Sequence, residues 1–229
     1  MFKFIKYFFY LAYNWNTRIA WYIVSEEIRG EKKYGIHTTG ADELKKLEEK
    51  GIDISHATIY MPVSYGLLAE VFEQLSSSNP QYPTHFLDIG CGKGRALCVA
   101  AHQGFTRITG IDISRELCED AKLNCDITRQ KFPAAEFSVI NNDAFYYKIP
   151  GDVDHIFMFN PFDEMIMSGV VENILESLHR VPRKLSIIYV NPLHKELFIK
   201  AGFNEIYHSK KMKYLEVAIL ERPQATVEN

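Results

Sequence analysis

Short apolar segments alternate with longer helix-forming segments from residue 85 onward, and this alternation constrains the fold more than any other feature. Helices of this length between consecutive strands give right-handed crossovers and a parallel sheet covered on both faces. Two last strands, near 204–208 and 214–220, are so closely connected that they must pair antiparallel. The sequence therefore predicts a doubly wound α/β fold, with a mostly parallel seven-stranded sheet and a C-terminal antiparallel pair. The five parallel strands are expected at 85–89, 107–111, 136–140, 155–159 and 185–190.

The N-terminal segment differs in composition from the rest of the chain. Residues 1–24 hold ten aromatic residues and three charges, all of them positive: Lys3, Lys6 and Arg18. Asn14 and Asn16 interrupt the apolar run, so it falls short of the roughly 20 apolar residues of a transmembrane helix. Peripheral contact with a membrane is left open, but we favour a helix packed on the α/β domain as a lid or docking segment. Residues 1–59 are thus an N-terminal helical extension, and residues 60–229 form the α/β domain.

The net charge and the cysteine spacing limit the partners and metal sites that we expect for this protein. The formal net charge is -3 and the pI about 6.2, which does not favour a nucleic-acid partner. No two cysteines have C-x-x-C spacing, so we expect reduced thiols in the core of a cytoplasmic protein and no metal site. The four cysteines are Cys91, Cys98, Cys118 and Cys125.

A glycine-rich segment follows the first predicted strand. Gly90, Gly92 and Gly94 allow a tight turn and let a ligand lie against the main chain. Asp88 supplies an anionic group suited to an ammonium, and the N-terminus of the next helix suits a carboxylate. An amino acid moiety carries both of these charges, so this loop is predicted to bind one.

Acidic residues also end the next two strands. Asp112 lies about 20 residues beyond the glycines, where a carboxylate can accept both hydroxyls of a ribose. At the end of the third strand, Asp143 could accept a hydrogen bond from an adenine amino group. Ligand contacts are therefore predicted at three successive strand ends.

With these motifs, the chain resembles the class I S-adenosylmethionine-dependent methyltransferases over roughly residues 60–220. The motifs that carry the resemblance are Asp88–Arg95, Gly110–Asp112 and Asn142–Ala144. The resemblance implies that S-adenosyl-L-methionine is the cofactor, with its methionine part at the glycines, its ribose at Asp112 and its adenine at Asp143. The implied cofactor-binding residues are Tyr60, Asp88, Gly90, Cys91, Gly92, Gly94, Asp112, Ile113, Asp143, Ala144 and Asn160.

The fourth predicted strand leads into Asn160-Pro161-Phe162, which is similar to the Asn-Pro-Pro-Tyr/Phe signature of methyltransferases that modify amino groups. There the Asn side chain and a Pro carbonyl accept hydrogen bonds from the target nitrogen, and an aromatic ring packs on the acceptor. This chain lacks one proline and continues with Asp163. A simple strand-to-helix turn, with Asp163 as the helix cap, therefore remains an equal alternative.

A second Asn-Pro pair ends the fifth predicted strand, at Asn191 and Pro192. His194 follows close by and could serve as the general base, although an exposed residue at a helix start is the more common role. We expect Lys93 and Arg95 to be solvated, and His155 to be a hydrogen-bonded core residue.

The sequence thus predicts a methyltransferase that acts on a nitrogen of a protein or small molecule. Two alternatives stay open: a non-catalytic S-adenosylmethionine-binding protein, and a membrane-associated lipid methyltransferase. Fold alone does not decide among them, and the sequence does not indicate the oligomeric state.

Overall fold

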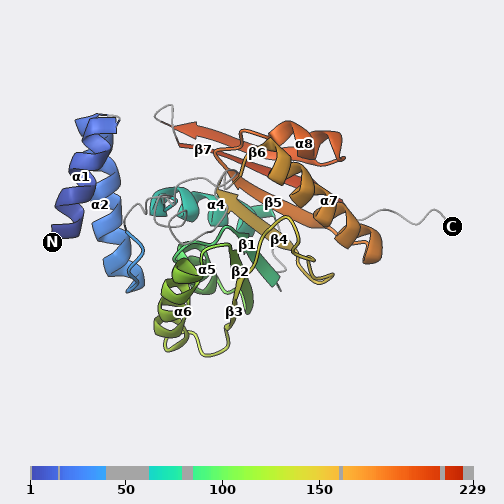
Figure 1. The fold of residues 1–229 in the computed structure, drawn as a ribbon, viewed down its shortest axis with the longest axis horizontal. Helices are drawn as coiled ribbons and strands as arrows, with labels where there is room; N and C mark the ends of the chain where they lie inside the picture. Colours follow the sequence, from blue (N-terminus) through green and yellow to red (C-terminus); the bar gives the residue numbers. More distant parts are fainter. Residues whose placement is uncertain are drawn as a thin grey trace.

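The computed structural model describes residues 2–14, 16–39, 62–78, 85–159, 162–211 and 215–223. Within them, seven strands form one sheet in the order β3-β2-β1-β4-β5-β7-β6 (Figure 1). Strands β1 to β5 run parallel, while β7 pairs antiparallel with both β5 and β6. The predicted fold class is confirmed. The strands are β1 His85–Ile89, β2 Arg107–Asp112, β3 Glu136–Asn141, β4 His155–Phe159, β5 Leu185–Val190, β6 Asn204–Lys211 and β7 Leu215–Arg222.

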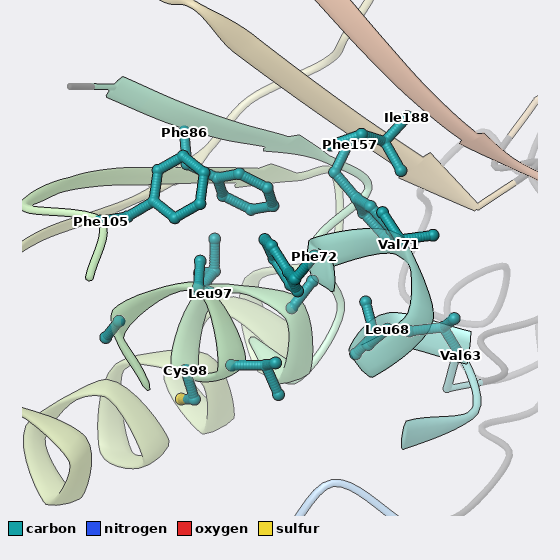
Figure 2. Close-up of a cluster of buried hydrophobic side chains, with 14 of the residues drawn as sticks. Val63, Leu68, Val71, Phe72, Phe86, Leu97, Cys98, Phe105, Phe157 and Ile188 are labelled. Atoms are coloured by element: carbon teal, nitrogen blue, oxygen red, sulfur yellow. The ribbon is translucent and has the colours of Figure 1, made fainter. Parts of the chain in front are cut away.

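Helices cover both faces of this sheet (Figure 1). Those that belong to the α/β domain are α4 Tyr65–Ser78, α5 Arg95–His102, α6 Arg115–Arg129, α7 Glu164–Arg180 and α8 Lys195–Lys200. Side chains alternate between faces along each strand, so β1 contributes Phe86 to one core and Leu87 to the other. Figure 2 shows the first core, where Phe72 of α4 and Leu97 of α5 meet Phe86 beneath the sheet.

The N-terminal extension forms two helices instead of the single helix that the sequence predicted. These are α1 (Phe2–Asn14) and α2 (Thr17–Tyr34). Asn16 begins α2 by accepting a hydrogen bond from the backbone N–H of Ile19 at 2.9 Å, which is the N-cap role that asparagine favours. Because that cap starts a new helix, the aromatic segment folds back on itself as a hairpin.

The two hairpin helices pack on each other through a small core of their own, made by Tyr7, Leu11, Ala20 and Val24. Residues 1–24 also reach the α/β domain, because a Cβ at Gly66 of α4 would lie 3.6 Å from the Tyr22 hydroxyl. Further contact with that domain comes from the second half of α2. There Gly30 lies directly against the ring of Tyr65. Among the described residues, no helix is long and apolar enough to cross a membrane.

The four cysteines are buried and free, as predicted. His155 is different: its Nδ1 is buried and has no hydrogen-bond partner within the described part of the chain. Its ring instead packs edge-on against Phe105, with centroids 5.4 Å apart. The predicted hydrogen bond is therefore wrong for this atom, and burial lowers the pKa of His155 to about 4. The predicted boundary between residues 59 and 60 lies outside the described residues.

Candidate active site

The loop between β1 and α5 has the backbone conformation that its glycines allow. Gly90, Gly92 and Gly94 have φ angles of 82°, 51° and 77°, in the left-handed region that favours glycine. Gly94 is also the N-terminal cap of α5, so the loop leads directly into that helix. The G-x-G-x-G spacing therefore matches three backbone requirements in succession.

Hydrogen bonds fasten this loop to the end of β2. The N–H groups of Gly90 and Cys91 both donate to the carbonyl oxygen of Ile111 at 2.9 Å. The N–H of Gly92 donates to Oδ2 of Asp112, also at 2.9 Å. Gly110 permits this close approach, since a Cβ there would lie 2.7 Å from Leu97 Cδ1 and 2.9 Å from Cys91 Sγ. The loop is thus held rigidly with its backbone donors already engaged.

Asp88 lies beside the loop as a buried carboxyl group, 3% exposed. Its Oδ1 has no hydrogen-bond partner in the described part of the chain. Burial, and after it the charge of Asp112, holds the pKa of Asp88 well above its usual range. A cation at this position would supply the missing partner and favour the ionised form. This fits the ammonium group that the sequence predicted for the loop.

Asp112 ends β2 and is held on both carboxylate oxygens. Oδ2 accepts from Gly92, and Oδ1 accepts from the N–H of Ser114 at 2.8 Å. Burial raises the pKa of Asp112, and these two hydrogen bonds oppose the rise. A carboxylate oxygen can accept more than one hydrogen bond, so the group keeps acceptor capacity for a ligand. Asn141 also stabilises the end of β2, because its side-chain amide donates to the carbonyls of Asp112 and Ile113 at 3.0 and 2.8 Å.

The third acidic position follows β3. β3 pairs with β2 up to Asp112 and Asn141, which brings the segment carrying Asp143 and Ala144 to the same edge. Oδ1 of Asp143 accepts from the N–H of Phe145 at 2.9 Å, and the Ala144 side chain is buried. The carboxyl ends of β1, β2 and β3 therefore lie along one edge of the sheet, in the arrangement that the sequence predicted.

The predicted acceptor segment follows β4, which lies between β1 and β5. In this register Ile89 pairs with Met158, and Phe159 pairs with Val190. Phe162 is half-buried and packs against the second core. Asn160, Pro161 and the predicted donor residue Tyr60 lie outside the described residues. Asp163 caps α7 by accepting from the N–H of Ile166 at 3.1 Å, as the turn alternative expected.

His194 lies just beyond β5. It is half-buried, and it caps α8 without a side-chain hydrogen bond to that helix. Its N–H donates to the Tyr189 hydroxyl at 3.4 Å. Asn191 has a φ of 49°, the only positive value outside glycine among the described residues, and such positions often mark functional loops. The short helix α8 begins directly after His194, at Lys195.

Arg95 is the main residue whose role the sequence prediction missed. The expectation of a solvated side chain is wrong, because Arg95 is 3% and Glu27 1% exposed. Its two terminal nitrogens donate to the Glu27 carboxylate at 2.6 and 2.5 Å. Its Nε donates to Thr38, and the guanidinium lies 4.1 Å from the ring centroid of Tyr65. Lys93 is half-buried and pairs with Asp120 at 3.4 Å.

Asn124 makes a second link between the N-terminal extension and the loop. Its Oδ1 accepts from the N–H of His37 at 2.9 Å, and its Nδ2 donates to the carbonyl of Lys93 at 2.9 Å. The sequence carried a signal for this residue, because Asn124 occupies a buried helical position between Ala121 and Thr128. A polar side chain at such a position needs buried partners.

A groove of about 500 Å³ lies along α7. Two acidic side chains and the Phe145 ring line this groove. None of the described residues that the sequence predicted for the site lines it. The lining residues are Phe145, Glu164, Met165, Ser168, Gly169, Glu172 and Leu197.

Residues 86–184 match the sequence profile of the methyltransferase domain family. Over this part of the chain, the protein is similar to methyltransferase domains. This match covers β1 to the end of α7, including the glycine loop and Asp112, whereas the N-terminal extension lies outside it. No curated protein matches the chain in sequence.

Solved structures share the fold of the α/β domain. A proposed O-methyltransferase from Nostoc punctiforme has a TM-score of 0.53 and 18% identity, over 68% of this chain and 57% of that one. The methyltransferase domain of bacterial CtHen1 has a TM-score of 0.52 and 17% identity, over 67% and 96%. The N-methyltransferase NodS from Bradyrhizobium japonicum has a TM-score of 0.51 and 15% identity, over 70% and 98%. At these identities the likeness establishes the fold and leaves the acceptor open.

Proposed function

We propose that the protein transfers a methyl group from S-adenosylmethionine to a nitrogen atom of a protein or small molecule. The observation that carries this proposal is the strand register. β4 pairs with β1 through Met158 and Ile89, so the segment that begins with Asn160 follows a strand end next to the glycine loop. Donor and acceptor groups would then meet at neighbouring strand ends, as in-line transfer requires.

The donor-binding roles follow from the charges at the sheet edge. Asp88 would hold the ammonium of the methionine part, because its buried Oδ1 otherwise lacks a partner among the described residues. Asp112, fixed by Gly92 and Ser114, would accept from the ribose hydroxyls. Asp143 would accept from the adenine amino group. When bound, the donor supplies an activated methyl group on a positively charged sulfur.

The acceptor-binding roles are assigned to residues after β4 and β5. The Asn160 side chain and the Pro161 carbonyl would accept hydrogen bonds from the target nitrogen, which aims its lone pair at the methyl carbon. Phe162 would pack against the acceptor. His194 would take the proton that the nitrogen loses after transfer, since histidine is the side chain that most often serves as a general base. β4 and β5 are direct neighbours, which supports a shared role for these segments.

The class of acceptor is tested by incubating the protein with methyl-labelled S-adenosylmethionine and fractionated cell extract. We expect label in protein or in amine-containing small molecules. Label in lipid would favour the lipid methyltransferase alternative. Binding of the donor with no label in any fraction would favour the non-catalytic alternative.

The role of Asn160 is tested with an Asn160→Ala variant once an acceptor is known. We expect kcat to fall about a hundredfold, as for other losses of reactant alignment, while the Kd of the donor stays nearly unchanged. Asn204→Ala, at the start of the edge strand β6, is the matched control and should leave both unchanged. If donor affinity fell instead, Asn160 would be a cofactor residue. If neither changed, the segment would be only a turn.

A further inference from the structure

The hairpin of α1 and α2 exposes several large apolar side chains. It stands beside the α/β domain, and its turn points away from α5 and α6 (Figure 1). Along α1, the exposed fraction rises toward this turn, from 47% at Ile5 to 66% at Phe9 and 92% at Tyr13. A spacing of four residues puts these three side chains on one helix face. On α2, Trp21 is 71% exposed. We call Ile5, Phe9, Tyr13 and Trp21 the hairpin surface.

The charges next to the hairpin surface are positive. Lys6 precedes Phe9 by three residues, and Arg18 precedes Trp21 by three, so each cation lies beside an exposed ring on its helix. Acidic residues begin only at Glu26, which pairs with Arg29, and Glu27, which is buried against Arg95. The hairpin surface is therefore complementary to a partner that is both apolar and anionic.

An anionic lipid bilayer combines these two properties. Trp and Tyr side chains prefer the boundary between headgroups and acyl chains, and Lys and Arg bind anionic headgroups. A single-chain soluble protein rarely leaves a row of large apolar side chains uncovered. Since no helix in the described part of the chain can span a bilayer, such contact would be peripheral.

We propose that the hairpin surface docks the protein on the surface of an anionic membrane. Phe9, Tyr13 and Trp21 would enter the headgroup region, and Lys6 and Arg18 would bind lipid phosphates. This role goes beyond methyl transfer and does not depend on the identity of the acceptor.

The chain offers a direct probe, because its two tryptophans, Trp15 and Trp21, both belong to the N-terminal segment. In a Trp15→Phe background, all tryptophan fluorescence comes from the hairpin surface. The protein is mixed with vesicles of phosphatidylglycerol and phosphatidylcholine, or of phosphatidylcholine alone. We expect flotation with the anionic vesicles only, a shift of Trp21 emission to shorter wavelength, and weakening by salt.

Three variants in the same background separate the contributions. Phe9→Ser should lower vesicle affinity about tenfold or more, because it removes a large apolar contact. Arg18→Gln should lower it about fivefold, the usual effect of one basic side chain near an anionic membrane. Leu123→Ser is the control, since Leu123 is 64% exposed on α6 and does not belong to the hairpin. This control should bind like the parent protein.

Absence of flotation with anionic vesicles would overturn the proposal, as would equal binding to both kinds of vesicle. It would also fail if Leu123→Ser and Phe9→Ser weakened binding equally. Sedimentation velocity supplies a further check without lipid. A dimer that disappears in Phe9→Ser, in a protein that does not bind vesicles, would assign the hairpin surface to a second copy of the chain.

Discussion

The buried ion pair between Arg95 and Glu27 should make the N-terminal extension essential to the stability of the domain. We consider Glu27→Ala. In the parent protein the carboxylate accepts two hydrogen bonds from the guanidinium, at 2.6 and 2.5 Å, and both side chains are almost inaccessible to water. In the variant, Arg95 would stay buried with neutral acceptors such as the Thr38 hydroxyl and the Val63 carbonyl. Leaving a buried charge uncompensated costs about 3–5 kcal/mol.

This loss is measured by chemical denaturation and by thermal unfolding, both followed by circular dichroism. For a chain of this size, about 2–4 °C of Tm is lost per kcal/mol, so Tm should fall by roughly 6–20 °C. Replacing both partners, in Glu27→Leu/Arg95→Met, should recover much of the stability, because no unpaired charge is then left in the core. Arg29→Ala is the control, since its ion pair with Glu26 has an arginine side chain that is 70% exposed. It should cost less than about 1 kcal/mol.

Two results would refute this reasoning. A loss below about 1 kcal/mol in Glu27→Ala would mean that water reaches Arg95. A double variant no more stable than the single one would mean that packing at this position, and not the unpaired charge, sets the cost.

Three further predictions concern the donor site and the core. Asp112→Ala should weaken S-adenosylmethionine binding in calorimetry, because each charge-assisted hydrogen bond that it loses contributes about 1.5–3 kcal/mol; unchanged affinity would contradict the role of Asp112. Gly110→Ala should lower the free energy of unfolding by about 1–3 kcal/mol, because its Cβ would lie 2.7 Å from Leu97. Burial lowers the pKa of His155 to about 4, whereas an unfolded histidine has a pKa of about 6.5. Between these two pH values, the unfolded chain therefore binds more protons than the folded chain. The free energy of unfolding should therefore fall as pH drops from about 6.5 to about 4, by up to about 1.4 kcal/mol per pH unit, and His155→Gln should reduce this slope in pH-dependent denaturation.

Much of the fold could be predicted because its signals are local. An apolar run such as His85–Ile89 indicates a strand without knowledge of its neighbours, and glycine at 90, 92 and 94 indicates positive φ angles within the turn itself. The acidic strand ends could be predicted for the same reason. Parallel strands bring their carboxyl ends to one edge, so Asp88, Asp112 and Asp143 needed only the strand order to be placed together.

The break between α1 and α2 at Asn16 also has a local signal in the sequence, although the prediction of a single helix did not use it. Asparagine is a strong helix cap, yet the aromatic residues on both sides suggested one continuous helix. The structure separates α1 from α2 at this cap, so the aromatic segment forms a hairpin with an exposed outer surface.

Which polar side chains are buried was decided by the tertiary structure alone. Arg95 begins a helix, where the sequence favours solvent, and its partner Glu27 lies 68 residues earlier. Asn124 meets His37 across 87 residues. The sequence by itself determined the strands, the glycine turn and the acidic residue at each strand end, because each depends on neighbours within a few residues. The links between the N-terminal extension and the glycine loop were decided by the tertiary structure. Their charged and amide side chains become neighbours only when the chain folds, and they pair because burial removes them from water.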